Sequence, residues 1–381
     1  MFVSDRRRRT EMEENMKVGI ITHHSVHNHG AILQLYGLIM TLKNFNCNAK
    51  ALDYKKNYDF FEEGIDNKYN ISIKSVPIYI EYLKKQGIKK TVFNIKKRKI
   101  LEEFKKEKQI IGEYYSHAKD LKAVFIGADE VFSIEPGLNP FFWGMGVPCK
   151  NIFSYAGSFG PTTLKYIDEK NAKEFINAGI NHLNKISVRD RNSYEIIKEI
   201  AGIEVPQFCD PVILYGYKKE KQKFVRPIKE KYMVIYAYDN NMNNRDEVER
   251  IINFARKNNF KIVSPGFYHR WCDINVNVNP IQLLEYINYA EIVITDTFHG
   301  TVTSLVMNTQ FITKIRGNSN KLGFLLDEYA VKNRETKNFT DLDIIYKSQI
   351  NYEEINEIIN NKQTEGKLYI KSCLESINEN Q

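Results

Sequence analysis

The chain has 381 residues, of which 43 % are hydrophobic and 12 % aromatic, and its formal net charge is +8. This length allows two domains of ordinary size, and the composition excludes a disordered chain. No apolar run approaches the roughly 18 residues that a membrane-spanning helix needs, and no signal-peptide apolar segment follows the arginines at residues 6–9. We therefore expect a soluble, cytoplasmic protein.

The positive charge has a local origin. Between Lys84 and Lys108 the chain has eleven Lys/Arg and three Glu, a surplus equal to the whole net charge. Apolar residues there recur with helical spacing, so we interpret the charges as solvated outer faces of helices. Binding to nucleic acid is therefore not expected. The alternative interpretation is a surface for the anionic headgroups of a membrane.

The first part of the chain predicts one α/β domain. Residues 1–15 are expected to form a loose extension, and residues 16–215 the domain. Strands are expected at residues 17–22, 47–53, 123–127, 151–156 and 186–189. Helices are expected at residues 31–42, 171–183 and 193–201, with a basic helical insertion at residues 74–115. Alternating strands and helices are typical of an open α/β sheet.

The pattern restarts after a lysine-rich stretch with Pro227, residues 216–231, which indicates a linker. Strands are expected at residues 232–238, 261–264, 291–295 and 310–315, and helices at residues 245–258, 280–288 and 301–307. These elements predict a second α/β domain, residues 232–334, followed by one or two helices in residues 335–381. We expect the two domains to face each other across a cleft, with ligands beyond the carboxyl ends of the strands.

The clearest polar motif is EIVITDTFHGT, residues 291–301. A buried strand is expected to deliver Asp296, Thr297 and His299 into a turn, after which Gly300 and Thr301 begin a helix. Polar groups at a strand end, beside a helix N-terminus, are placed to bind an anion and to exchange protons. In the competing interpretation, Asp296 caps the helix and His299 is a hydrogen-bonded turn residue.

Four histidines occur in HHSVHNHGAILQ, residues 23–34. They form no i, i+4 pair on a helix, and no carboxylate follows before Asp53, so a metal site is not expected. None of the five scattered cysteines forms a CxxC pair either. The preferred interpretation is a strand-to-helix loop in which Gly30 allows the backbone to approach a ligand.

Two further segments place charged groups at strand ends. FIGADEVF ends a strand with Asp129 and Glu130, which suit sugar hydroxyls or a helix cap equally well. SVRDRNS ends another with Arg189 and Arg191 around an aspartate. A guanidinium there can bind a carboxylate or phosphate, or form only a structural ion pair.

Taken in order, seven segments resemble the polysaccharide pyruvyl transferase family. They are KVGIIT…NHGAILQLYGL, AVFIGADEVF, SYAGSFG, ISVRDRNSYEII, DPVIL, ITDTFHGTVTSLVMNTQFI and KLGFLLDEY. The resemblance implies an α/β fold with two Rossmann-like domains across a cleft, GT-B-like, with C-terminal helices. It also implies transfer of an enolpyruvyl-derived group from phosphoenolpyruvate, a co-substrate, to a sugar of a bacterial surface or capsular polysaccharide precursor, leaving a pyruvate ketal. No cofactor is implied.

The resemblance also suggests roles for individual residues. The predicted catalytic residues are His299 and Asp296. The predicted donor-binding residues are Arg189, Arg191, Arg316, Lys314, Thr297, Gly300 and Thr301. The predicted acceptor-binding residues are His29, Gly30, Gln34, Asp129, Glu130 and Ser158. The expected acceptor is a lipid-linked or nucleotide-linked oligosaccharide, with the membrane contact, if there is one, made by residues 84–108.

The chain departs from the family pattern at two places. Some members carry a basic residue where this chain has Thr297, so we expect the donor anions to be bound from elsewhere, chiefly by Arg189. The usual GSDxVW-like segment is GADEVF here, with Ala128 and Phe132 at the changed positions. Two alternatives stay open: a glycosyltransferase that uses a nucleotide sugar, and a non-catalytic glycan-binding relative.

Overall fold

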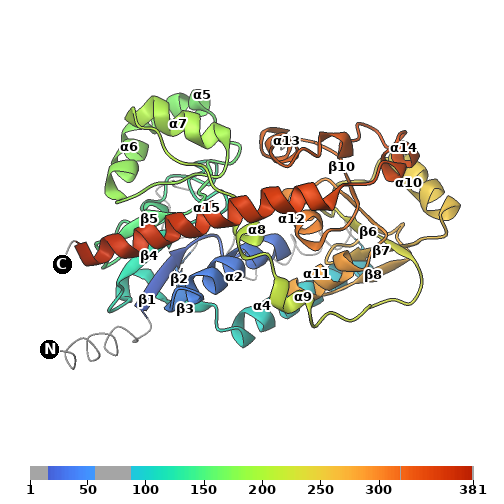
Figure 1. Cartoon of the computed structure of the whole chain (residues 1–381), viewed down its shortest axis with the longest axis horizontal. Coiled ribbons are helices and arrows are strands. Elements are labelled where there is room, and N and C mark those ends of the chain that lie inside the picture. Colours follow the sequence, from blue (N-terminus) through green and yellow to red (C-terminus); the bar gives the residue numbers. More distant parts are fainter. Residues whose placement is uncertain (1–15, 56–86, 318, 380–381) are drawn as a thin grey trace.

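The computed structural model describes residues 16–55, 87–317 and 319–379, which form two α/β halves side by side along the long axis (Figure 1). The expected extension, residues 1–15, and the first part of the basic insertion, residues 74–86, lie outside the described residues. Each half is built around its own five-stranded parallel sheet.

The first sheet has the strand order β3-β2-β1-β4-β5. Its strands are β1 (Met16–Ile21), β2 (Cys47–Asp53), β3 (Ile111–Tyr114), β4 (Ala123–Ile126) and β5 (Ile152–Ser154). The residues of β4 and β5 are all buried, as expected for strands that helices cover on both faces. Ile21 pairs with Ile126, and Ile126 with Ser154, so three strands end level at one edge of the sheet.

The second sheet repeats this order, as β10-β9-β6-β7-β8. Its strands are β6 (Tyr232–Tyr236), β7 (Lys261–Pro265), β8 (Ile274–Val276), β9 (Ile292–Thr295) and β10 (Phe311–Thr313). In both sheets the first strand lies at the centre, and the fourth strand pairs with its other side. Ligands bind at such switch points in open α/β sheets. The predicted α/β class is confirmed.

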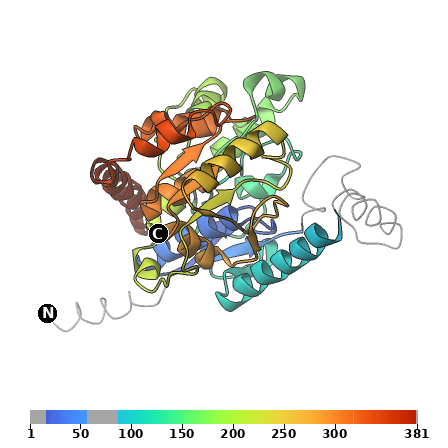
Figure 2. The same cartoon turned by 90° about the vertical axis from the view of Figure 1, so that its right-hand side faces the viewer.

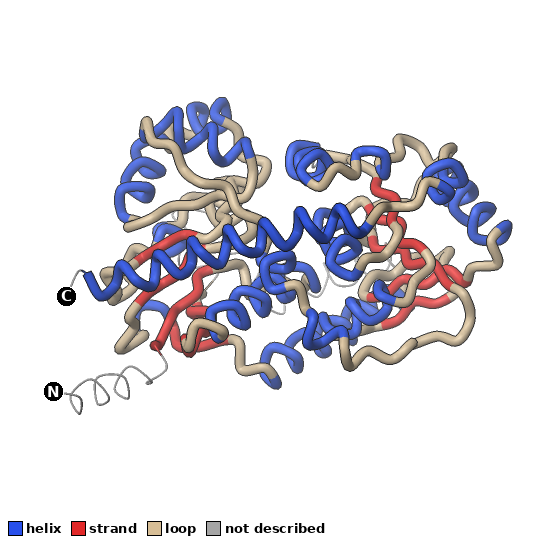
Figure 3. The backbone as a smooth tube through the Cα atoms, viewed as in Figure 1, coloured by secondary structure: helices blue, strands red, loops and turns tan. Residues whose placement is uncertain are grey.

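Helices cover both sheets, as the tube view shows (Figure 3). In the first half they are α2 (His29–Lys43), α4 (Ile88–Glu107), α5 (Leu164–Glu169), α6 (Lys173–His182), α7 (Arg191–Ala201), α8 (Pro211–Tyr215) and α9 (Lys218–Lys221). In the second half they are α10 (Arg245–Lys257), α11 (Pro280–Asn288), α12 (Phe298–Met307), α13 (Ser319–Glu328), α14 (Leu342–Lys347) and α15 (Tyr352–Glu379). Short 3-10 turns are η3 (Tyr115–His117), η4 (Pro140–Trp143) and η5 (Lys332–Arg334).

The last helix, α15, ties the halves together by running back across both of them (Figure 1). The Gln363 side chain donates to the Ile213 carbonyl at 2.7 Å, and Lys185 donates to the Ser372 carbonyl at 2.9 Å. At its start, the Tyr352 hydroxyl donates to the Thr309 carbonyl in the second half. The C-terminal helices therefore hold the relative position of the two halves.

Some elements predicted from the sequence differ from those in the structure. The strand expected at residues 186–189 is an extended segment with isolated bridges at Lys185 and Val188. Strands β3 and β8 were not expected, because these edge strands are only three or four residues long and partly exposed, so they lack the continuous apolar run of a central strand. Helix α13 was also missed, and the expected linker contains the short helix α9.

The basic segment forms the single helix α4 within the described residues, but the expectation that its charges all face outward is wrong. Lys90, Lys97 and Lys105 are buried. Their inward orientation has a physical cause, because the surface under α4 offers backbone carbonyls and an aromatic ring to ammonium groups.

Candidate active site

A cavity of about 670 Å³ lies where the carboxyl ends of the two sheets face each other. Six strand ends contribute to its wall. The contributing residues are His23 after β1, Tyr54 after β2, Asp129 and Glu130 after β4, Tyr238 and Asn241 after β6, Asp296, Phe298 and His299 after β9, and Arg316 after β10. Arg189 and Lys321 complete the charged lining. The cavity therefore lies at the switch point of both sheets.

His299 lies in the first turn of α12, one residue inside the helix, whereas the sequence suggested a turn. The helix begins earlier than expected because Thr297 caps it: the Thr297 hydroxyl accepts a hydrogen bond from the Gly300 amide at 2.9 Å. The Thr301 hydroxyl contacts the Thr313 hydroxyl at 2.9 Å. Thr297, Gly300 and Thr301 thus lie behind the cavity wall and orient the helix that carries His299.

Two groups hold the His299 ring. Its Nε2 lies 3.3 Å from Gln34 Oε1 and 3.7 Å from Asp210 Oδ2. Asp210 is buried, and burial by itself raises the pKa of its carboxyl. His299 and Arg189 more than offset this effect and lower the pKa below its ordinary value. Asp210 is therefore a buried carboxylate beside the imidazole, an arrangement that fixes the orientation of the ring.

Gly30 makes room for His299. A Cβ at this position in α2 would lie 2.3 Å from Cγ of the His299 ring. The glycine thus lets a side chain approach the helix, whereas we expected it to let a ligand approach the backbone. Its neighbour His29 is fully buried, with Nε2 2.9 Å from the Val278 carbonyl, and burial lowers its pKa to about 3. We expected His29 to contact the acceptor, but the structure places it outside the cavity.

Arg189 and Arg191 have different surroundings. Arg189 lines the cavity, and its Nη1 donates to Asp210 Oδ2 at 2.8 Å and to Gln34 Oε1 at 3.3 Å. Arg191 is exposed outside the cavity, 3.3 Å from Glu195. The reason is local: Asp190 caps α7 with its side chain, so Arg191 starts a helix on the surface. Arg189 and Arg191 were both predicted to bind the donor, and of these two only Arg189 lines the cavity.

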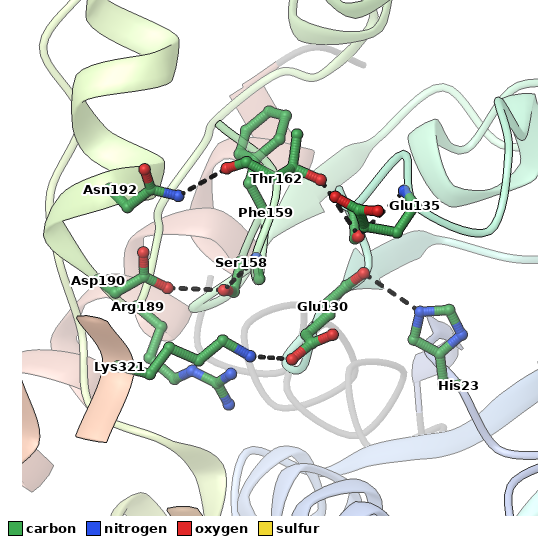
Figure 4. A network of polar contacts seen from close by, with 12 residues as sticks. His23, Glu130, Glu135, Ser158, Phe159, Thr162, Arg189, Asp190, Asn192 and Lys321 are labelled. Atoms are coloured by element: carbon green, nitrogen blue, oxygen red, sulfur yellow. Dashed lines mark hydrogen bonds and ion pairs between the residues drawn. The ribbon is translucent and has the colours of Figure 1, made fainter. Parts of the chain in front are cut away.

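The segment after β4 contributes both predicted carboxylates. Asp129 has a left-handed backbone with φ of 73° and lines the cavity with Glu130, which forms an ion pair with Lys321 (Figure 4). Burial raises the pKa of Asp129, but Arg189 and then His299 lower it below its ordinary value. Ser158 lies behind this wall, where its hydroxyl donates to Asp190 at 2.6 Å. It does not reach the cavity.

The opposite wall has a chain of alternating charges. Arg316 Nε donates to Asp296 Oδ2 at 2.7 Å, and Arg316 Nη2 donates to Glu247 Oε2 at 2.9 Å. Glu247 also pairs with Lys314, which lies behind the cavity wall. Burial raises the pKa of Asp296, and the ion pair with Arg316 offsets only part of this shift. The wall therefore presents a guanidinium paired with a carboxylate whose pKa burial raises.

Several polar cavity residues and one supporting group were not predicted. The cavity residues include His23, Tyr238, Asn241 and Lys321, and the supporting group is Asp210. Signals existed for three of them: His23 opens the histidine-rich segment, Asp210 opens DPVIL, and Lys321 opens KLGFLLDEY. No pattern marked Tyr238 or Asn241, which lie just past the end of a strand.

Within the described ranges, residues 16–55, 87–317 and 319–379, no group of three or more His, Cys, Asp or Glu side chains is arranged to hold a metal ion. No helix in the same ranges is long and apolar enough to cross a membrane.

Several solved structures are similar to this chain. A protein from Listeria monocytogenes assigned as a UDP-N-acetylglucosamine 2-epimerase is 11 % identical, with 96 % of this chain and 98 % of that chain covered and a TM-score of 0.53. A UDP-N-acetylglucosamine 2-epimerase from Rickettsia bellii is 12 % identical, with 96 % and 98 % covered and a TM-score of 0.49. A spinosyn rhamnosyltransferase is 9 % identical, with 95 % and 100 % covered and a TM-score of 0.45. The first likeness, with the two parallel sheets, confirms the GT-B-like fold.

Sequence comparison is more specific about the family. No curated protein sequence matches the chain. The family model described as polysaccharide pyruvyl transferase matches residues 28–315, which include every strand end around the cavity except that of β1. The chain therefore belongs to the polysaccharide pyruvyl transferase family, a family of transferases.

Proposed function

We propose that this protein transfers the enolpyruvyl-derived group of phosphoenolpyruvate to a sugar of a surface-polysaccharide precursor, forming a pyruvate ketal and releasing phosphate. The observation that carries the proposal is the cavity in which His299, held beside buried Asp210, faces several cationic side chains. Family membership supports the same reaction class. The acceptor we propose is a lipid-linked or nucleotide-linked oligosaccharide in the cytoplasm.

The donor carries a carboxylate and a phosphate, so it needs cations. Arg189, Arg316 and Lys321 all line the cavity. Thr297, which replaces the basic residue of some relatives, is buried as a helix cap and offers no charge. We assign the missing cation to Lys321, which belongs to α13 and already pairs with an anionic partner, Glu130, at the cavity wall. The donor phosphate would replace that carboxylate as its partner.

The reaction requires a proton at the methylene carbon of the donor. Protonation makes C2 electrophilic, one sugar hydroxyl adds there and loses its proton, phosphate leaves, and a second hydroxyl adds and loses its proton. His299 suits either proton transfer because an imidazole can donate or accept a proton and Asp210 lies 3.7 Å from its Nε2. Asp296, whose pKa burial raises, is the second candidate acid. The sugar is then placed against Asp129 and Glu130 on the facing wall.

The direct test is a purified enzyme assay. We would incubate the protein with phosphoenolpyruvate and a panel of nucleotide-linked and lipid-linked sugars, and measure phosphate release and acid-labile pyruvate on the sugar. Phosphate release that requires both substrates would support the proposal. Added chelator should leave that rate unchanged, because the proposed chemistry uses no metal.

The same assay separates the alternatives. Release of nucleotide from a nucleotide sugar, with phosphoenolpyruvate unused, would instead identify a glycosyltransferase. A His299→Ala variant that still supports the polysaccharide pathway in cells would identify a non-catalytic glycan-binding protein and refute the proposal.

A further inference from the structure

Helix α4 buries three lysines, Lys90, Lys97 and Lys105, on the same inner face as three apolar side chains, Phe93, Leu101 and Phe104. Lys90 Nζ donates to the Asp239 carbonyl at 3.1 Å, and Lys105 Nζ donates to the His24 carbonyl at 3.2 Å. Asp239 follows β6 and His24 follows β1, so the inner face of α4 bridges the two halves. Lysine stems therefore share with apolar side chains an inner face that is mainly apolar in most amphipathic helices.

The outer face has the apolar residues. Ile88, Val92 and Ile95 are 74 %, 44 % and 65 % exposed. Their spacing of four and three residues places them in one stripe along the helix. Among the described residues they are three of the eight large hydrophobic side chains that are exposed, and no other helix has such a stripe. A contiguous exposed apolar stripe marks an interaction surface.

Basic side chains surround the stripe. Lys89, Lys96, Arg98 and Lys99 are all exposed, and residues 87–99 contain no Asp or Glu. Glu102 and Glu103 appear only in the next turn. The N-terminal half of α4 therefore combines an aliphatic centre with a positive border. Figure 2 shows α4, in cyan, along the outer edge of the molecule.

We propose that the outer face of α4 binds the surface of a membrane that contains anionic phospholipid. Aliphatic side chains enter the boundary between headgroups and acyl chains, while lysine stems extend along the surface toward phosphate. Nucleic acid fits less well, because aliphatic side chains neither stack on bases nor pair with phosphates. The helix would lie in the plane of the interface without crossing it.

The surface lies close to the cavity. Tyr238 and His23, which line the cavity, are the chain neighbours of Asp239 and His24, the residues on which α4 rests. A bilayer on the outer face would thus be about one helix diameter, roughly 10–12 Å, from the segments that form the cavity wall. This placement suits an acceptor held by a lipid anchor, but the proposal itself does not depend on the identity of the donor.

The test is co-sedimentation of the full chain with lipid vesicles. The probes are vesicles of phosphatidylcholine alone and of phosphatidylcholine with about one-third phosphatidylglycerol. We expect binding to the anionic vesicles only, and weaker binding as salt rises. Lys89→Ser with Lys96→Ser should lower the affinity about 25-fold, at about fivefold per charge. Ile88→Ser with Ile95→Ser should lower it about tenfold or more although the charge is unchanged.

The matched control is Ile344→Ser with Leu368→Ser, which removes apolar residues of similar exposure, 74 % and 60 %, from α14 and α15. This control should bind vesicles like the unaltered chain. Absence of binding to anionic vesicles would overturn the proposal. Equal binding by the control and by Ile88→Ser with Ile95→Ser would overturn it too. Self-association of the unaltered chain that Ile88→Ser with Ile95→Ser abolishes, without vesicle binding, would instead assign the stripe to a second copy of the chain.

Discussion

Two polar clusters border the cavity, and they differ in burial and in origin. The interdomain cluster consists of Gln34, Arg189, Asp210 and His299. The C-terminal cluster consists of Glu247, Asp296, Lys314 and Arg316. The side chains of Arg189 and Asp210 are 5 % and 1 % exposed, whereas that of Arg316 is 27 % exposed. The first cluster joins both halves, and the second belongs to one half.

This difference predicts what each cluster can tolerate. In the interdomain cluster, removal of Arg189 or Asp210 leaves the other charge buried, so structure and function are affected together. In the C-terminal cluster, solvent reaches the Arg316 guanidinium, so its loss should cost less stability, although its partner Asp296 is buried. The predictions below test that contrast in order of expected size.

The largest effect should come from His299→Ala. The variant removes the proposed proton-transfer group but leaves the Arg189–Asp210 ion pair intact, so the fold should be retained. We expect the turnover rate to fall by about 10²–10⁴-fold, with a melting temperature close to that of the unaltered protein. Phosphate release and thermal unfolding measure the two quantities. Unchanged turnover would remove His299 from the mechanism.

The second-largest loss of rate should come from Gly30→Ala, which changes the position of the His299 imidazole but not its chemistry. The added Cβ would lie 2.3 Å from the His299 ring, so the ring must move. A displacement of about 1 Å at a catalytic group costs on the order of 10²-fold in rate. The control is Gly323→Ala in α13, where the nearest atoms to a new Cβ are 3.9 Å away. Equal rates for the two variants would contradict the proposed constraint.

The sequence predicted the strand-end part of the site because parallel strands bring their carboxyl ends to one edge. That rule located His299 and Asp129. It did not locate Asp210, which is 89 positions before His299 and meets it only because the halves dock in one particular way. The same rule predicted donor contacts for both Arg189 and Arg191. It could not separate them, because Arg191 lies on the surface only since α7 begins at that residue, after the cap Asp190.

Helix α4 shows the same limit for the fold. Helical spacing was predictable, and it was confirmed within the described residues. Apolar residues of the pattern, such as Leu101 and Phe104, are buried. The burial of Lys90 and Lys105 beside them was not predictable, because hydrophobic periodicity assumes an apolar surface beneath a helix. Here the surface also presents the carbonyls of Asp239 and His24, which accept from these lysines. Such contacts join segments about 80 and 150 positions apart.

A smaller change, in the affinity for the donor, should come from Arg316 of the C-terminal cluster. Arg316→Ala removes a partly exposed guanidinium at the cavity wall, and the half-saturating concentration of phosphoenolpyruvate should rise about 10- to 100-fold because a charge-assisted contact is lost. The melting temperature should fall as well, because the buried Asp296 loses an ion-pair partner. Arg191→Ala is the matched control, since Arg191 is exposed outside the cavity. Steady-state kinetics that show the same change in both variants would mean that Arg316 does not bind the donor.

The smallest effect should be a pH dependence that Asp210 gives to stability. The pKa of Asp210 in the folded protein is below its ordinary value of 3.8, so the folded state binds fewer protons than the unfolded state near that pH. Its contribution to the free energy of unfolding is therefore complete above about pH 3.8 and is lost as the pH falls through the lower, folded pKa. Urea unfolding of the unaltered protein and of Asp210→Asn should differ most near neutral pH. Below pH 3.8 the difference should narrow, by at most about 1.4 kcal/mol per pH unit. A difference that widens in acid would mean that Asp210 is not the buried carboxylate on which the interdomain cluster depends.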